Sequence, residues 1–259
     1  MNEYYFDGYK VTELSYFDYK NLVKNLLTED IEVLNNVFND IFNKHIDMQN
    51  KSLTLYDKFK LIIFLRSLIL GEELQIEYKD KSYNLDINYI LKNANIINEE
   101  IETDLLIFKT PTSFYIKDFT SEVLNSIKSI KINDKNINVE KFNSNEKIEL
   151  FNEITDDNLM SVYNRTVINL QKSVINFLDL ELSVYNGDII LLFKNIFNTD
   201  LNNLYDFEYN LIRHLNINSQ DFKNYSYSEL KIFYNKLIKE NKDNNKREEK
   251  TIGHKEISM

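Results

Sequence analysis

The chain has 259 residues, a net charge of -10 at pH 7 and a sequence pI of about 5.0, and such an acidic chain is a poor general binder of nucleic acid. It contains no cysteine, which excludes disulfide bonds and thiolate metal sites. Neither a signal peptide nor an apolar run long enough to cross a bilayer is visible, so we expect no membrane insertion.

A strand and two helices are predicted first. Residues Tyr9–Leu14 can form a short strand, and apolar residues at helical spacing predict a helix over Tyr16–Leu27. Thr28 is expected to cap a second helix. The first turn of that helix, where the helix dipole favours anions, would hold Glu29, Asp30 and Glu32.

The most apolar stretch follows, and its helix is well delimited. Thr54 and Asp57 have the spacing of a capping box, and Gly71 stands where a helix needs a left-handed residue after its last turn. These signals predict a helix over residues 55–70.

Arg66 is the unusual residue of this helix. It lies among apolar side chains, opposite the stripe of polar residues formed by Asp57, Lys60, Ser67 and Gly71. A guanidinium in that position needs a carboxylate, backbone carbonyls or a partner protein. It can therefore be an internal clamp or an interface arginine, and we favour the clamp.

Beyond Gly71 the period of the apolar residues changes to two. This alternation predicts a β-hairpin over residues 73–87, with its turn at Lys79-Asp80-Lys81, and then a short helix or turn over Ile87–Lys92. Asp104–Lys109 and Ser113–Phe119 are the next expected strands, separated by Pro111.

The middle and C-terminal parts continue this alternation. Around the turn 133–136 we expect a second hairpin, and Thr155, Asp156 and Asp157 are expected to start a helix that runs to Leu170. Val174–Val184 is predicted as one strand, and Asp188 as the N-cap of the helix after it. The other predicted helices are Ser121–Ile127, Ser144–Ile154, Leu201–Leu215 and one that starts at the capping box Ser226–Glu229, with Leu230, Phe233, Tyr234, Leu237 and Ile238 facing inward.

Together these elements predict an α+β fold of capped helices packed on small antiparallel hairpins or sheets, with a mainly helical C-terminal part. We expect an N-terminal α+β part (1–119), a middle hairpin with helices (120–172), a C-terminal strand with helices (173–243) and a flexible polar tail (244–259).

No pattern of catalytic, metal-ligating or cofactor-binding residues is visible. The three histidines are not clustered, and no phosphate-binding glycine loop or nucleophile elbow occurs. The adjacent acids Glu99 and Glu100 are typical of a solvated loop, and Asp156 and Asp157 of a helix N-terminus. We therefore expect no enzyme, and a carboxylate-dependent hydrolase acting through Asp156 and Asp157 is only a distant alternative.

Aromatic residues concentrate near the C-terminus, in LYDFEY (204–209) and FKNYSY (222–227). Such residues usually pack in the core, but they also form protein contacts. The candidates for structural or interface roles are therefore Arg66, Asp57, Gly71, Tyr205, Phe207 and Tyr209.

The order of segments resembles the baseplate hub, or hub-assembly, family of T-even-type contractile-tail bacteriophages. The resemblance lies in LYDKFKLIIFLRSLILGEELQIEY (55–78), in NLDIN (84–88) and in the hairpin and helices of 126–163, and it covers most of residues 9–170. Residues 204–240 are also similar to the ends of tail-associated proteins. The positions that match the family pattern in the first segment are Asp57, Leu65, Arg66, Ser67, Gly71 and Glu72.

The resemblance implies a non-enzymatic hub component or hub-assembly factor. Its partners would be other tail and baseplate hub proteins, and it would reside in the host cytoplasm during assembly and in the virion baseplate. The chain departs from the family in lacking the paired cysteines of some members, so no zinc is carried over, and in lacking a proline and paired glutamates in FDYKNLVKNL (17–26). A soluble adaptor unrelated to phage tails is the alternative.

Overall fold

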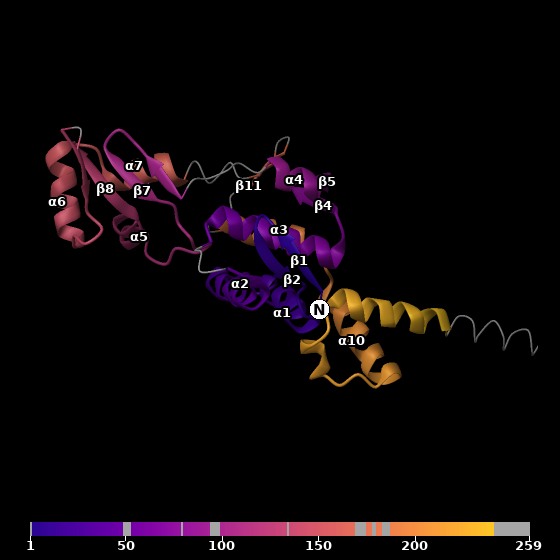
Figure 1. The fold of residues 1–259 in the computed structure, drawn as a ribbon. Helices are drawn as coiled ribbons and strands as arrows, with labels where there is room; N and C mark the ends of the chain where they lie inside the picture. The colour runs from indigo at the N-terminus through magenta and orange to yellow at the C-terminus, as the bar shows by residue number, and fades with distance from the viewer. Residues whose placement is uncertain are drawn as a thin grey trace, which may run out of the picture.

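A computed structural model gives the fold of the chain (Figure 1). It describes residues 2–48, 53–78, 80–93, 99–133, 135–168, 175–177, 180–182 and 187–240. Helices pack on small antiparallel sheets around two separate clusters of buried side chains, which confirms the α+β prediction. We call the part around the larger cluster the main lobe and the part around the smaller cluster, within residues 100–168, the small lobe. No helix among the described residues has the length and apolar character needed to span a membrane.

The main lobe begins with a hairpin that the sequence prediction placed only in part. Strands β1 (Glu3–Phe6) and β2 (Tyr9–Thr12) pair around Asp7 and Gly8, whose φ angles of 48° and 80° suit a two-residue hairpin turn. Strand β3 (Ile46–Asp47) pairs with β2. The Asp-Gly dipeptide is the sequence signal for this turn.

Helices α1 (Tyr16–Leu26) and α2 (Ile31–His45) follow, and their capping residues are Ser15 and Asp30. The prediction that Thr28 caps α2 is wrong, because the Asp30 carboxylate accepts the Val33 amide, and only Glu32 lies in the first turn. Thr28 instead donates its hydroxyl to the Asn25 carbonyl at the end of α1.

A partly buried polar cluster joins these two helices. Asp18 of α1 accepts hydrogen bonds from Lys44 at 2.8 Å and from the Ser15 hydroxyl at 2.8 Å, and its Oδ2 lies 3.0 Å from Nε2 of His45. His45 also contacts the Thr12 hydroxyl, 3.3 Å from Nδ1. The cluster therefore holds the end of α2 against the start of α1 and the C-terminal end of β2.

Helix α3 (Leu55–Leu70) has the predicted bounds and the predicted capping box of Thr54 and Asp57. Gly71 ends it with φ 86° and ψ -174°, a conformation that favours glycine but is extended rather than left-handed helical. The chain therefore passes directly into the predicted hairpin of β4 (Glu73–Tyr78) and β5 (Lys81–Asp86). Lys81 pairs with Tyr78, so the prediction that it belongs to the turn is wrong. Helix α4 (Ile87–Asn93) follows at once.

The small lobe is a four-stranded antiparallel sheet with helices packed on it (Figure 1). The strands, in spatial order, are β6 (Glu100–Glu102), β7 (Leu106–Lys109), β8 (Ile127–Ile132) and β9 (Lys135–Asn138). The helices are α5 (Phe119–Ser126), α6 (Ser144–Ile154), α7 (Leu159–Tyr163) and the π-helix η1 (Asn164–Ile168). Glu100 thus belongs to a strand and not to the expected loop, and its carboxylate contacts Lys128.

The expected strand Ser113–Phe119 is absent, because this segment joins the two lobes. Phe114 is buried in the main lobe against Phe38 and Phe193. Asn35 of α2 accepts hydrogen bonds from the Ser113 hydroxyl and the Phe114 amide. These contacts with a helix take the place of strand pairing.

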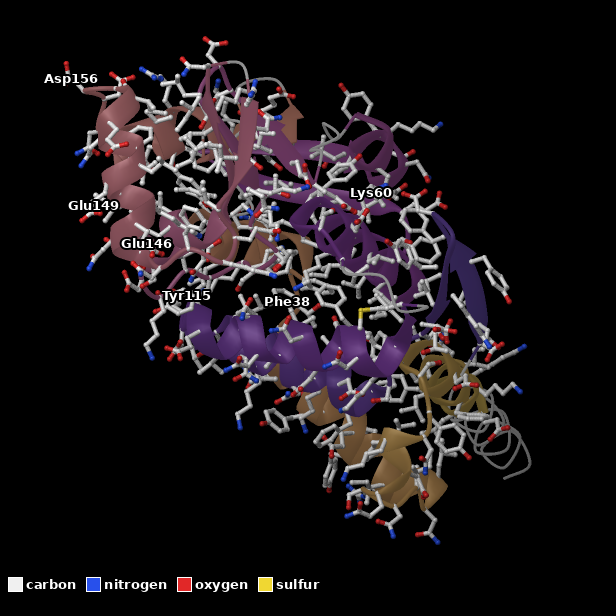
Figure 2. All side chains as sticks on the ribbon, turned by 60° about the vertical axis from the view of Figure 1, so that its left-hand side comes forward. Phe38, Lys60, Tyr115, Glu146, Glu149 and Asp156 are labelled. Carbon is white, nitrogen blue, oxygen red and sulfur yellow. The ribbon has the colours of Figure 1, made fainter. Side chains whose placement is uncertain are left out.

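Helix α7 also begins later than predicted. Its N-cap is Asn158, whose side chain accepts the Ser161 amide at 3.1 Å. Asp156 and Asp157 precede the helix, and Asp156 lies at the outer end of the small lobe (Figure 2). After Tyr163 the α-helix continues as the π-helix η1, so it is not a regular α-helix over the predicted length. Residues 169–170 of the predicted helix lie outside the described part.

The C-terminal part returns to the main lobe. Ile175–Phe177 (β10) and Leu180–Leu182 (β11) form a hairpin, so the single strand predicted over Val174–Val184 is wrong. Helix α9 (Gly187–Ile196) starts before Asp188, which is therefore not its N-cap. The elements that follow are α10 (Leu201–Leu215), the short helix η2 (Asp221–Lys223) and a helix over residues 227–240.

The larger core draws on both ends of the described chain. Tyr16 of α1 packs against Phe207 and Phe222, and its hydroxyl donates to the Leu204 carbonyl at 2.5 Å. The amide of Tyr16 also donates to the Tyr225 carbonyl. The two cores cross the boundaries of the expected ranges 1–119, 120–172 and 173–243, and those ranges stay a prediction. The predicted tail, 244–259, lies outside the described residues.

Candidate protein interaction site

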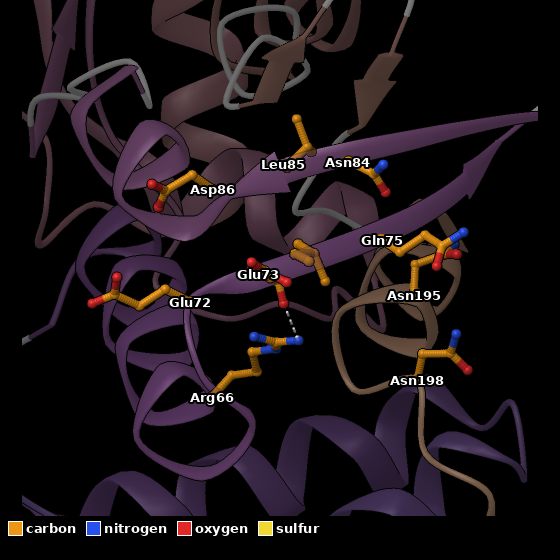
Figure 3. Close-up of a pocket in the computed structure, with 10 residues that line it drawn as sticks. Arg66, Glu72, Glu73, Gln75, Asn84, Leu85, Asp86, Asn195 and Asn198 are labelled. Atoms are coloured by element: carbon orange, nitrogen blue, oxygen red, sulfur yellow. Dashed lines mark hydrogen bonds between the residues drawn. The ribbon is translucent and has the colours of Figure 1, made fainter.

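Arg66 makes no ion pair within the described chain and is held by three backbone carbonyls, of which Figure 3 shows the bond to Glu73. Its Nε donates to Ile196 at 3.0 Å, one Nη donates to Gly71, and the other donates to Glu73 at 2.9 Å. These carbonyls belong to the last residue of α9, the residue after α3 and the first residue of β4. Arg66 therefore connects three elements.

The position of these carbonyls explains the choice of a cation. Helix C-termini leave carbonyl groups without intrahelical partners and carry a partial negative charge, which a buried guanidinium complements. Arg66 is only 6% exposed, and burial lowers the pKa of its guanidinium from the ordinary value. Its three hydrogen bonds all go to carbonyls of the chain itself, and the side chain also lines the cleft described next.

A polar cleft of about 800 Å³ lies beside Arg66, between the β4–β5 hairpin and the end of α9 (Figure 3). Apart from Arg66 its charged residues are acids. The acids that line it are Glu72, Glu73 and Asp86, and the amides are Gln75, Asn84, Asn195 and Asn198. Its mouth is therefore acidic.

Asp57 lies away from this cleft, at the start of α3. Its carboxylate accepts hydrogen bonds from the Thr54 amide at 3.1 Å and the Thr54 hydroxyl at 2.7 Å. These bonds account for Asp57 as a capping residue. Asp57 and Gly71 thus stand at opposite ends of α3, and of these two only Gly71 touches Arg66.

The aromatic candidates of α10 divide between core and surface. Phe207 is 7% exposed and packs against Tyr16, Tyr227 and Tyr234. Tyr205 and Tyr209, by contrast, are 46% and 58% exposed. Neighbouring positions in one aromatic run therefore have different roles, because a helix turns by about 100° per residue.

Tyr205 borders a groove of about 430 Å³ between α1, α10 and η2. Phe17 of α1, which is 45% exposed, forms part of its other wall. Lysine 20 reaches across the groove, where its ammonium group contacts the Glu208 carboxylate and lies 4.0 Å from the centre of the Tyr205 ring. Phe17 was not among the residues predicted from the sequence, although it precedes the inward-facing Tyr19 by two positions and therefore falls on another side of the helix.

The helix over 227–240 adds further exposed apolar side chains. Ile232 and Phe233 are exposed, so the prediction that Phe233 faces inward is wrong. Leu230 is buried and Tyr234 packs on the core, which leaves the positions between them outside. In the sequence, the four-residue spacing of Leu230 and Tyr234 indicates which face of this helix is turned towards the core.

The acidic pairs do not form a metal site. Within the described residues there is no group of three or more histidine or acidic side chains placed to hold a metal ion. Asp156 and Asp157 are both exposed, and Asp157 forms a 3.9 Å ion pair with Arg165.

Comparison with known proteins identifies the family. No curated protein and no solved structure matches the chain significantly. The model of a family described as T4 bacteriophage base plate protein does match, over residues 7–184, which is more than half of the chain. This chain therefore belongs to that family and has a structural role in the tail baseplate of a T4-type phage.

Proposed function

We propose that the chain is a component or an assembly factor of the baseplate hub in a contractile tail, and that it acts through protein contacts without catalysing a reaction. The observation that carries the proposal is the set of exposed aromatic and aliphatic side chains on α10 and on the helix over 227–240. Those on α10 are Tyr205, Tyr209, Ile212 and Leu215, and those on the later helix are Ile232 and Phe233.

The spacing on α10 supports a contact surface. Tyr205, Tyr209 and Ile212 are separated by four and three positions, so they lie along one side of the helix. Tyrosine contributes much to protein interfaces because it offers a large rigid area together with a hydroxyl group. Such residues on the solvent side of α10 do not pack in the core of the chain, so they are available for contact with another protein.

The hub assignment is supported by the sequence motifs in α3 and β4–β5, which resemble those of hub proteins. Family membership makes an adaptor unrelated to phage tails a poor explanation of the chain. The proposal of a non-enzymatic role is supported by two charged residues predicted from the sequence. Arg66 donates hydrogen bonds to backbone carbonyls and Asp57 caps a helix, so both act as structural groups.

Mass spectrometry of purified virions and of baseplate intermediates from infected cells tests the proposal. A hub component would be present in virions in a fixed ratio to other tail proteins. An assembly factor would be present only in the intermediates. Absence from both preparations would contradict the proposal.

The position in the baseplate is tested separately. A small tag fused to the chain and located by electron microscopy should lie near the central axis of the particles. A tag at the baseplate periphery would contradict a hub assignment while leaving the baseplate role intact.

A further inference from the structure

We propose that the groove between α1, α10 and η2 binds an acidic segment of another baseplate protein, anchored by an apolar side chain. This inference rests on the proposed function, because it names the chemistry of one of its partners. The evidence is the shape of the groove, its charge and the arrangement of its aromatic rings.

The floor of the groove is fixed and apolar. Tyr16 and Phe222 are buried at its base, with ring centres 5.1 Å apart, and the Tyr16 hydroxyl is bonded to the Leu204 carbonyl. A preformed floor needs little reordering when a ligand binds, which favours affinity. Phe17 and Tyr205 stand on the two sides as partly exposed walls, so one apolar side chain could insert between them.

The rim of the groove is basic, although the chain as a whole carries a net charge of -10. Its charged residues are three lysines and one glutamate: Lys20, Lys24, Lys223 and Glu208. Glu208 is paired with Lys20, whereas no acidic side chain in the described part of the chain pairs with Lys24 or Lys223. At physiological salt, charges more than about 8 Å away are largely screened, so a ligand in the groove meets these lysines rather than the net charge of the whole chain.

The lysines are placed beside the aromatic walls. The Lys223 ammonium group lies 5.2 Å from the centre of the Phe17 ring, as that of Lys20 lies over Tyr205. This arrangement puts a cation next to each apolar wall. A segment in which acidic residues flank a phenylalanine, tyrosine or leucine is complementary to both features.

The competing anionic ligand is a single-stranded nucleic acid, whose bases could stack on the same rings. It fits less well, because its phosphates continue beyond the groove and would meet an acidic protein surface. A short peptide places its negative charge only where the lysines are. We therefore commit to the protein segment and use nucleic acid as an outcome of the test.

Site-specific photocrosslinking in infected cells tests the inference. The phage gene would carry Phe17→p-benzoylphenylalanine, and a matched variant would carry the same group at Tyr5, an exposed residue of β1. We expect position 17, and not position 5, to crosslink to a baseplate protein within a segment rich in aspartate and glutamate. A crosslink to a neutral or basic segment, to nucleic acid or to no macromolecule would overturn the inference.

Binding of the crosslinked segment, made as a synthetic fluorescent peptide, then tests the charge. We expect the double variant Lys24→Glu/Lys223→Glu to bind it at least ten-fold more weakly than the unmodified full chain. The matched double variant Lys231→Glu/Lys239→Glu has the same charge change on the helix over 227–240 and should bind within two-fold. Equal weakening by both variants would overturn the inference.

These outcomes are separable from the proposed function. If the chain is found in virions or hub intermediates while the groove crosslinks nothing, only the inference about the groove fails. If the groove captures an acidic segment while the chain lies outside the hub, the hub assignment fails instead.

Discussion

The Nε of Arg66 donates a 3.0 Å hydrogen bond to the carbonyl of Ile196, a residue 130 positions further along the chain. This bond connects α3 to the end of α9 across the main lobe. With the bonds to Gly71 and Glu73 it satisfies three carbonyls at positions where two helices end and a strand begins. Because the connection lies within the chain, removal of the Arg66 side chain should change the stability of the fold.

We predict that Arg66→Ala lowers the free energy of unfolding by roughly 3–5 kcal/mol, because three carbonyls near the core lose their donor. Urea unfolding of the purified protein measures this change. Arg66→Lys should recover only part of the loss, since one ammonium group cannot reproduce the fork of a guanidinium. Arg165→Ala, at an exposed position, is the control.

The outcome also decides between a clamp and a docking residue. If Arg66→Ala melts within about a degree of the unchanged protein and has lost a tail partner, the clamp interpretation is wrong. A large loss of stability supports the clamp, whatever happens to assembly.

Alanine variants of Phe207 and Tyr209, two residues of α10, should have contrasting effects on stability. Phe207→Ala should lower the free energy of unfolding by about 3–5 kcal/mol, because it removes a ring from the core. Tyr209→Ala should change it by less than about 0.5 kcal/mol, as an exposed substitution. Thermal unfolding measures both.

The same two variants test the proposed contact surface. Tyr209→Ala should reduce the incorporation of the chain into baseplate intermediates despite normal stability. Normal incorporation of Tyr209→Ala, together with that of Tyr205→Ala, would mean that this side of α10 is not used.

Asp18 should make stability depend on acid pH. Burial acts to raise the pKa of this carboxyl, but hydrogen bonds from His45, Lys44 and Ser15 outweigh it and hold the pKa well below the ordinary value of 3.8. A lowered pKa in the folded state means that the unfolded chain binds the proton first as the pH falls. The contribution of the Asp18 carboxylate to the free energy of unfolding is therefore fully present above pH 3.8, the pKa in the unfolded chain. It decreases as the pH falls from 3.8 through the lower pKa of the folded state.

The comparison of Asp18→Asn with the unchanged protein checks this sign. The difference in free energy of unfolding between the two should shrink as the pH falls below about 4. Asp30→Asn is a useful control, because asparagine also caps helices well. A difference that grows at low pH would show that Asp18 is not held as a stabilised carboxylate.

The start of α7 gives a prediction that differs from the one drawn from sequence. The acids Asp156 and Asp157 were expected to serve the helix dipole, and their replacement by alanine would then weaken the helix by roughly 0.5–2 kcal/mol. Since the N-cap is Asn158, we now predict less than about 0.5 kcal/mol for the double variant. Asn158→Ala should lower the free energy of unfolding by about 1 kcal/mol.

The double variant also tests the distant hydrolase alternative. Replacing both acids should leave the assembly of infectious particles unchanged. A metal-dependent hydrolytic activity that disappears in this variant would reverse the proposal that the chain is not an enzyme.

Local sequence determined the helices and hairpins whose ends are set by neighbouring residues. The helices over Leu55–Leu70, Ser144–Ile154 and Leu201–Leu215 have the predicted bounds, and the β4–β5 hairpin lies within the predicted residues 73–87. The physical reason is that a capping bond spans three residues and a hairpin turn spans two. Both can therefore be recognised without knowing the rest of the fold.

Tertiary structure alone decided what each distinctive side chain does. Residues Ser113–Phe119 were expected to form a strand, but contacts with Asn35 and Phe38 in α2 and with Phe193 in α9 make this segment the link between the lobes. Arg66 donates to Ile196, which is 130 positions away, and the two aromatic walls of the groove, Phe17 and Tyr205, are also more than 100 positions apart. No short-range pattern encodes such distances, because they depend on how whole helices pack and not on the residues beside them.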